Sequence, residues 1–422
     1  MANIKIAVVP FSFPGNTVSF DVTAAELGGV TPKAVMLFGG GHRIVNDATS
    51  TADGTIELGA SDGTRQTSVS GHLSNANTST IAGGVNVRNT MCLGISTNGT
   101  TEVIQIAFTS WLAGGARFTC VRDNRITKNA VRLCAVFFAG DDLEAYVGTT
   151  TIASGTVNIT APGFEPDVVI TACGGLTSYG GDYYPRISYG IAANTDGGIK
   201  QRAVSFHGAI AAPGTNPTRM ASRSDACVIR INTTDGSYTY VTSAADFDAD
   251  GFSLVTPSGA IAHIVTYIAL RFGGHKVDLV DFLTPTATGN TEVYDGFDVL
   301  AEFLMSSVRT AYTNSGTVAS NEVGLGMSAG AKSSGEAASA MRCSTLTSPT
   351  VAYNKTVADK EQLLFSGTSA IVVGENASRT GGLTIDFTTV DTTARQVFGF
   401  VVEDKVDLEP YNSGTRRSVH VM

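Results

Sequence analysis

The chain of 422 residues has little charge and few of the residues that usually carry catalysis or bind metals. Charged side chains make up 15% of it, and it contains 6 histidines, 6 cysteines and 1 tryptophan. This low charge, together with 43% hydrophobic residues, argues against disorder, coiled coils and long surface helices. No apolar run approaches the roughly 20 residues of a membrane-spanning helix, so we expect no membrane partner.

An excess of basic residues is also missing. The chain has 28 Lys and Arg against 37 Asp and Glu, a formal net charge of −9. Such a chain repels phosphate backbones on average, which argues against nucleic acid as a partner. The N-terminal run Ile4–Val9 contains Lys5 and stops at Pro10, so it is too short for a secretory signal and synthesis is expected in the cytoplasm.

What the sequence does contain is an internal repeat. Asp62-Gly63 and Asp196-Gly197 lie 134 positions apart, and so do Phe118 and Phe252. A more diverged third copy follows 131 positions after the second, where Leu383 matches Phe252. Units of roughly 130 residues have the size of ordinary domains and exceed the 20 to 50 residues of solenoid repeats. We therefore predict three tandem domains over residues 1–149, 150–284 and 285–412, followed by a tail over 413–422.

Each unit has the pattern of an all-β domain. Its apolar segments are short, rich in Val, Ile, Phe and Tyr, and separated by Gly, Asn, Asp, Ser and Thr, which is typical of a sandwich or barrel. Residues 17–22 alternate apolar and polar side chains, as a strand with one wet face does. Residues 265–270 and 396–402 are almost continuously apolar, which predicts strands buried between two layers. The expected fold is three tandem, jelly-roll-like β-sandwiches.

Two regions leave the secondary structure open. Residues 299–311 have apolar side chains at helical spacing, but the matching segments of the other copies read as strands, so we predict a strand there. Residues 70–84 and 314–340 are rich in Ser, Thr, Asn, Ala and Gly, and we expect extended surface loops.

The strongest metal-binding motif is the acidic run that starts at Asp246. Asp246, Asp248, Asp250 and Gly251 match the first half of a calcium-binding loop, in which alternate carboxylates converge on the ion. The closing glutamate of such a loop falls at Pro257, and the other two copies lack these acids. A solvated acidic turn is therefore favoured over a Ca²⁺ site, and no other cofactor is expected.

Catalytic motifs are weak. Gly326–Gly330 fits the Gly-x-Ser-x-Gly pattern of a nucleophile elbow, but the strand-turn-helix context that this motif needs is not predicted. There is no Cys-x-x-Cys, and Cys120 and Cys134 are replaced in the second copy by Leu254 and Ile268, so the cysteines are expected to be buried apolar residues. His42 follows three glycines at the end of an apolar strand, yet its second-copy counterpart is Leu176. We expect no enzyme.

A cluster of tyrosines offers a binding alternative. The rings of Trp111 and of four tyrosines in and beside a Gly-rich segment of the second copy could stack on the apolar face of a sugar: Tyr179, Tyr183, Tyr184 and Tyr189. Tyrosines next to glycines serve equally well as anchors of a protein interface. Glycan binding and protein contact both stay open for this segment.

The second copy also carries a resemblance. The segments 163–170, 188–192, 247–254 and 267–270 resemble a β-domain found in virion structural proteins of tailed bacteriophages. The resemblance covers most of residues 150–275, is weaker over 1–149 and is faint in the third copy. It implies a non-enzymatic component of the virion, either capsid-associated, such as a decoration protein, or part of the tail, and it carries over no functional residues.

Under that interpretation the protein is made in the host cytoplasm, is located in the virion, and binds other virion proteins and further copies of itself through broad surfaces. The alternative is a host-binding adhesin that recognises a surface glycan through the tyrosine-rich segment.

Overall fold

The computed structural model describes residues 4–14, 19–40, 50–51, 53–74, 83–98, 101–124, 131–182, 186–208, 219–232, 236–257, 262–315, 323–343, 352–358, 360, 362–366 and 369–405. These residues are almost entirely strands, with one 3₁₀ turn, η1 (Ala25–Leu27). Within them no helix is long and apolar enough to cross a membrane. The expected all-β fold is confirmed.

The strands form six antiparallel sheets, which we group into three sheet pairs of one larger and one smaller sheet each. Sheet pair 1 has a large sheet in the order β1 (Ile4–Phe13), β11 (Val131–Gly140), β3 (Pro32–Gly39), β5 (Asp53–Ser61), β6 (Gln66–Ser74), β7 (Gly83–Arg88). Its small sheet has the order β2 (Ser19–Thr23), β10 (Gly115–Asp123), β9 (Thr101–Leu112), β8 (Leu93–Asn98).

Sheet pair 2 has a large sheet in the order β12 (Glu144–Ile152), β22 (His263–Arg271), β14 (Val168–Cys173), β16 (Arg186–Thr195), β17 (Gly198–His207), β18 (Arg219–Arg223). Its small sheet has the order β13 (Gly155–Ile159), β21 (Gly251–Thr256), β20 (Tyr238–Asp248), β19 (Val228–Ile231).

Sheet pair 3 has a large sheet in the order β23 (Val277–Leu283), β32 (Gln396–Glu403), β25 (Val299–Ser307), β26 (Val323–Ala331), β27 (Gly335–Cys343), β28 (Ala352–Ala358). Its small sheet has the order β24 (Gly289–Tyr294), β31 (Leu383–Thr389), β30 (Ser369–Ser378), β29 (Gln362–Ser366). Two short strands, β4 (Ser50–Thr51) and β15 (Gly180–Asp182), join the edges of large sheets in other pairs.

The strand order is the same in all three sheet pairs. The first strand of each pair lies beside the last, and the second beside the second-last, which is the nested winding of a jelly roll. The third to sixth strands instead follow one another across the large sheet. Phe118, Phe252 and Leu383, which match in the sequence repeat, all lie on the second strand in the order of their small sheets, β10, β21 and β31.

The large sheets are buried on both faces. One face packs on the small sheet of the same pair, for example through Leu37, Ile106 and Phe118 in sheet pair 1. The other face contributes to a central core that all three large sheets share. The strands β22 and β32 therefore lie between two packed layers, as their continuous apolar runs predict.

Aromatic rings connect the three sheets in the central core. Phe38 of sheet pair 1 contacts Phe303 of sheet pair 3, with ring centroids 5.9 Å apart. Phe272, which follows β22, lies 6.4 Å from Phe138 and 6.5 Å from Phe400. Edge and tilted contacts at these distances add to the burial of apolar area. The central core thus ties all three sheet pairs together.

The structure settles the two open segments of the sequence. Residues 299–307 form the strand β25, as predicted. The expectation of loops over 70–84 and 314–340 is wrong where β6, β26 and β27 pass through these tracts. In β26, Leu325, Met327 and Ala329 face the central core, and glycines or serine occupy the alternate positions. Small residues on the second face let the layers approach closely, which composition alone does not reveal.

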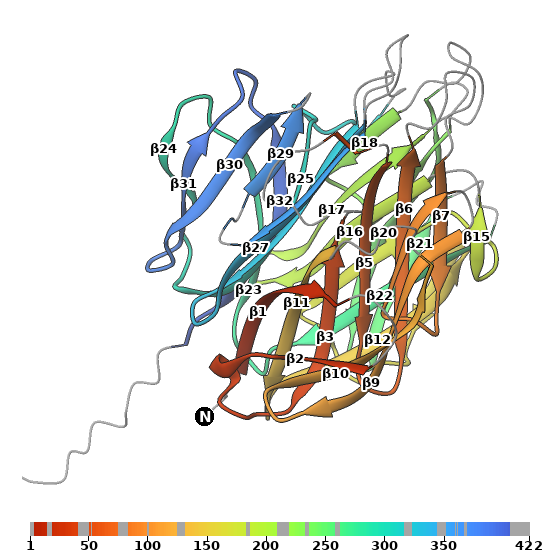
Figure 1. Ribbon diagram of the computed structural model, residues 1–422, viewed down its shortest axis with the longest axis horizontal. Coiled ribbons are helices and arrows are strands. Elements are labelled where there is room, and N and C mark those ends of the chain that lie inside the picture. The colour runs from red at the N-terminus through yellow and green to blue at the C-terminus, as the bar shows by residue number, and fades with distance from the viewer. Residues whose placement is uncertain are drawn as a thin grey trace, which may run out of the picture.

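The sheet pairs contact one another in a closed ring. In Figure 1 sheet pair 3, cyan to blue, lies on the left, and sheet pair 1, red to orange, lies on the right. In sheet pairs 1 and 3 the turn after the fourth strand of the large sheet contacts the first strand of the next pair. In sheet pair 2 this turn contacts Lys276, just before β23 of sheet pair 3, and the following strand β17 contacts β23 itself. Three such head-to-tail contacts close the ring, so that each sheet pair has both of its joint surfaces in contact with a neighbour.

Candidate functional site: the joints between the sheet pairs

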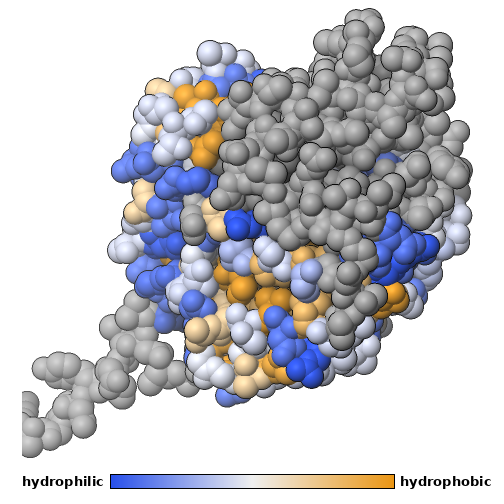
Figure 2. All heavy atoms as spheres, in the orientation of Figure 1, coloured by the Kyte–Doolittle hydropathy of each residue, from blue (hydrophilic) through white to orange (hydrophobic). Residues whose placement is uncertain are grey.

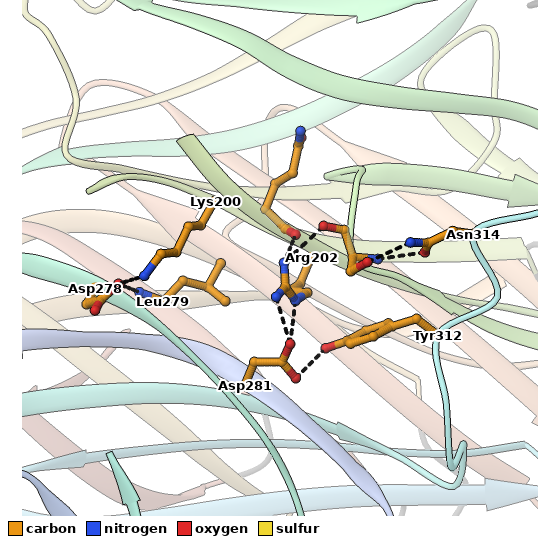
Figure 3. A network of polar contacts seen from close by, with 9 residues as sticks. Lys200, Arg202, Asp278, Leu279, Asp281, Tyr312 and Asn314 are labelled. Carbon is orange, nitrogen blue, oxygen red and sulfur yellow. Dashed lines mark hydrogen bonds and ion pairs between the residues drawn. The ribbon is translucent and has the colours of Figure 1, made fainter. Parts of the chain in front are cut away.

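The joint between sheet pairs 2 and 3 holds the network drawn in Figure 3. Arg202 on β17 donates from Nε to Oδ2 of Asp281 on β23 over 2.8 Å. Its Nη1 donates to the carbonyl oxygens of Gln201 and Ser224 over 2.7 and 2.9 Å. Lys200, two residues earlier on β17, donates to Asp278 over 2.6 Å. Lys200 and Arg202 are alternate residues of β17 and share one face of that strand, whereas their partners Asp278 and Asp281 are three positions apart on β23.

The ion pair between Arg202 and Asp281 is partly buried and has a further hydrogen-bond partner. The side chains of Arg202 and Asp281 are 19% and 27% exposed, so water screens them only in part. The hydroxyl of Tyr312 donates to Oδ1 of Asp281 over 2.7 Å. Burial, and then the neighbouring Asp281 carboxylate, raise the pKa of Tyr312, which keeps this phenol a donor. The carboxylate is therefore bound from two sides.

The other two joints use the same elements with different side chains. In the joint from pair 1 to pair 2, Asp62 accepts a hydrogen bond from the backbone N–H of Val147 over 3.0 Å, and the Arg65 guanidinium lies 4.0 Å above the ring of Tyr146. In the joint from pair 3 to pair 1, the hydroxyl of Ser334 accepts from the N–H of Val8 over 2.7 Å.

A second set of contacts covers the edges of the large sheets. The strand β15 of pair 2 pairs with β7, the edge strand of pair 1, and β4 of pair 1 pairs with β28, the edge strand of pair 3. In pair 3 the N–H of Thr313 donates to the carbonyl oxygen of Ser222 on β18, the edge strand of pair 2, over 2.8 Å. Asn314 exchanges two hydrogen bonds with Ser224 just beyond it. One edge of each large sheet, at β7, β18 or β28, is thus partly covered by a segment of another pair, which limits strand pairing there.

The joints and edge contacts leave the small sheets on the outside of the ring. Figure 2 shows one face of the molecule, with hydrophobic residues gathered at its lower centre, over the region where Figure 1 draws β2, β3 and β10. Partly buried hydrophobic side chains of sheet pair 1 include Phe11, Phe20 and Trp111. Mixed apolar and polar surface of this kind suits contact with another protein.

The acidic run does not gather into a metal centre in the described structure. Asp246, Asp248 and Asp250 are exposed at the end of β20 and in the turn to β21, and Asp246 Oδ1 accepts the N–H of Phe247 over 2.9 Å. Among the described residues, no group of three or more His, Cys, Asp or Glu side chains could hold a metal ion. The calcium hypothesis gains no support from this geometry.

Two of the predicted tyrosines can be placed: Tyr179 is at the surface, whereas Tyr189 is buried, so the expectation that Tyr189 belongs to a sugar-stacking platform is wrong. Tyr179 is 41% exposed, and its hydroxyl lies 2.6 Å from the hydroxyl of Thr149 on β12. Tyr183 and Tyr184 lie outside the described residues. The nearby Tyr189 is fully buried, and its hydroxyl donates to the carbonyl oxygens of Ile56 and Val69 in sheet pair 1. Tyr189 therefore belongs to the contact between sheet pairs.

The other sequence motifs lie in strands or outside the described residues. Gly326–Gly330 lies inside β26, where Ser328 is buried, and no helix follows as a nucleophile elbow requires. The five described free cysteines are all buried, as expected, and burial raises the pKa of the Cys227 thiol to about 12. His42 lies outside the described residues.

Sheet pair 1 contains a buried polar row that the sequence did not reveal. Glu57, Ser70 and Asn86 occupy directly paired positions on β5, β6 and β7 and are at most 1% exposed. Ile56 and Leu58 belong to the central core, so Glu57 points to the opposite face, toward the small sheet. Burial raises the pKa of Glu57 well above its usual range, which favours the neutral acid.

The joint residues were also missed from the sequence. Lys200, Arg202, Asp278 and Asp281 follow no motif, and contacts between residues about eighty positions apart leave no periodic pattern in one sequence. The one available signal was the Asp-Leu pair that recurs near each unit boundary, at Asp142, Asp278 and Asp407. Comparison with protein-family models, curated proteins and solved structures finds no match.

Proposed function

We propose that the protein is a non-enzymatic structural component of a tailed-phage virion, associated with the capsid or part of the tail, and that it acts through broad protein–protein surfaces. The observation that carries the proposal is the closed ring: three sheet pairs of one strand order, joined head to tail within a single chain. Such a ring presents three related outer surfaces around one axis, which suits a threefold position of a lattice or a coaxial trimeric partner.

Two further observations support this proposal. The second copy resembles virion β-domains in the segments given above. One edge strand of each large sheet, β7, β18 or β28, is partly covered by a neighbouring sheet pair, which favours assembly through side-chain surfaces over strand addition at these edges. The division of the chain into three domains is part of the proposal, with each sheet pair as one domain; β12, which begins at Glu144, would then belong to the second.

The test is to locate the protein in purified particles. Quantitative mass spectrometry of particles, combined with labelled imaging, should find it at a fixed number of copies per particle. Hundreds of copies would indicate the shell or the tail tube, and a few would indicate the fibre or tip. Recovery only in the particle-free fraction would contradict the proposal.

A second candidate is a host-binding adhesin, which the exposure of Tyr179 favours. An aromatic ring at the surface of a Gly-rich segment can stack on a sugar. A glycan array probed with the full chain and with Tyr179→Ala, Tyr183→Ala and Tyr184→Ala would test it. Specific binding that these changes abolish would support the adhesin, and absence of any binding by the unmodified chain would contradict it.

A further inference from the structure

Sheet pair 2 carries a row of cationic side chains at one end of its large sheet. Arg186 on β16 is directly paired with His207 on β17, and His207 is directly paired with Arg219 on β18. Side chains at directly paired positions lie next to one another on the same face of a sheet. The row therefore places an imidazole between two guanidinium groups.

Two more basic residues reach the same place from other strands. Arg230 comes from β19 of the small sheet and His263 from the start of β22, and their Nη1 and Nε2 atoms lie 2.6 Å apart. Gly175, with a φ of 65°, lies between the arginines: a Cβ there would be 3.6 Å from Arg186 and 3.7 Å from Nε of Arg230. We call Arg186, His207, Arg219, Arg230 and His263 the cationic cluster.

The cluster is mostly buried but opens to solvent at Arg186. His207, Arg219 and His263 are 5%, 9% and 2% exposed, whereas the side chain of Arg186 is 17% exposed. Asp182 also lies at this opening, with Oδ2 3.3 Å from Nη2 of Arg186. Solvent therefore reaches the cluster at Arg186.

Arginine side chains act on both imidazoles of the cluster. Burial, followed by repulsion from Arg186 and Arg230, lowers the pKa of His207 to about 3. Burial, followed by repulsion from Arg230 and Arg186, lowers the pKa of His263 to about 4. Both imidazoles are therefore neutral near pH 7, and each can donate one N–H while the arginines keep their charge.

The fold does not require these residues. A Cβ on Gly59 would lie 2.0 Å from the carbonyl oxygen of Cys92, and one on Gly190 would lie 1.9 Å from that of Cys227, so the two glycines mark equivalent positions. Four residues before these glycines lie Thr55 in sheet pair 1 and Arg186 in sheet pair 2. The residues paired with them across the next two strands are His72 and Gly84 in sheet pair 1, and His207 and Arg219 in sheet pair 2. Sheet pair 1 forms the same sheet without the two arginines of this row.

We propose that the cationic cluster is a binding site for a tetrahedral oxyanion, a phosphate or sulfate group. Planar guanidinium groups bind such oxyanions through two parallel N–H donors, and Arg186, Arg219 and Arg230 approach the opening from three strands. The net charge of −9 repels long polyanions, so the ligand is a single group on a small molecule or at the end of a chain. This site is independent of the proposed structural function.

The test is a titration of the full-length protein with inorganic phosphate, followed by calorimetry and by NMR of the histidine side chains. Saturable binding should shift the ring signals of His207 and His263 and raise the pKa of both, since a bound anion favours the imidazolium. Arg230→Gln and Arg219→Gln should each weaken binding at least tenfold, and Arg230→Lys should restore part of the loss. Arg117→Gln, an exposed arginine that pairs with Asp21 in sheet pair 1, is the matched control and should leave binding unchanged.

Parallel titrations with sulfate and acetate define the ligand class. Sulfate should compete with phosphate and acetate should not. The proposal is wrong if phosphate leaves the histidine signals of the unmodified chain unmoved, if Arg230→Gln and Arg117→Gln bind phosphate equally, or if acetate binds as tightly as phosphate. The measurements on the unmodified chain decide the matter even where a variant fails to fold.

Discussion

Arg202 of sheet pair 2 and Asp281 of sheet pair 3 form an ion pair across the joint between their sheets, with Nε and Oδ2 2.8 Å apart. Arg202 also binds two backbone carbonyl oxygens, and Asp281 also accepts from Tyr312. The pair therefore joins four segments of chain at one point: β17, β23, the residues that follow β18 and the residues that follow β25. Charge-assisted hydrogen bonds in such a partly buried network contribute more than an isolated surface pair does.

Removing this arginine should loosen the joint. We expect Arg202→Ala to lower the free energy of unfolding by about 1–3 kcal/mol, because Asp281 and two carbonyl oxygens lose a donor. Urea denaturation followed by tryptophan fluorescence and circular dichroism measures the change. Asp281→Asn and the double variant complete a cycle, in which non-additive losses would show direct coupling between the two residues.

Lys276→Ala is the matched control for this joint. Lys276 pairs with Asp196 between the same two sheet pairs over 3.0 Å, but the two side chains are 57% and 84% exposed. Screening by water should make its loss hard to detect. Equal destabilisation by Arg202→Ala and Lys276→Ala would contradict the role given to the buried network.

Two glycines should be intolerant of any side chain. A Cβ on Gly59 or on Gly190 would lie 2.0 or 1.9 Å from a backbone carbonyl oxygen of the facing small sheet, so that the two layers would have to separate. We expect Gly59→Ala and Gly190→Ala each to lower the melting temperature, with a cost of about 1–3 kcal/mol or more. Gly197→Ala, where the nearest atom is 3.8 Å away, should have little effect. Similar melting temperatures for all three variants would refute this account of layer packing.

The sequence predicts the strands better than the contacts between sheets. The repeat can be recognised at Phe118 and Phe252, because two identical residues recur at the spacing of the other matches. Both residues lie on equivalent strands. The strand β26 was missed because its second face is built from glycine and serine, residues that are typical of loops. Small residues are needed in β26 because two layers pack closely there, and local propensity does not indicate such packing.

The cationic cluster was also hard to predict, because its residues come together only through the pairing of strands. Arg186, His207 and Arg219 are adjacent only through strand register, and residues 186 and 219 lie 33 positions apart in the sequence. In the sequence His207 stands among apolar residues as a single histidine. A cluster that forms across strands therefore leaves no local motif, whereas the acidic run at Asp246 is a local motif without a converging site.

The buried acid of sheet pair 1 should make stability depend on pH. The pKa of Glu57 is higher in the folded than in the unfolded protein, so between the two values the folded state binds more protons. Its contribution is full below the unfolded value of about 4.3 and is lost as the pH rises toward the folded pKa. Glu57→Gln, which keeps the shape of the neutral acid, should remove this loss.

The measurement is urea denaturation of both proteins from about pH 4.5, just above the ordinary glutamate pKa, to about pH 8. The unmodified chain should lose stability relative to Glu57→Gln as the pH rises. Glu336, whose pKa burial raises to about 7, adds a slope of the same sign to both proteins and cancels in the comparison. Parallel curves would show that Glu57 is not buried as a neutral acid.

The edge contact at β18 should depend on one backbone amide. Thr313→Pro removes the N–H that donates to Ser222, whereas Thr313→Ala keeps it and is the matched control. We expect amides of β18 (Arg219–Arg223) to exchange about tenfold faster in the proline variant, which corresponds to about 1.4 kcal/mol of local stability. Since an uncovered edge strand can pair with another chain, light scattering should also detect association of the proline variant. Unchanged exchange in both variants would mean that the side chains of Tyr238 and Asn314 hold the segment in place without the amide.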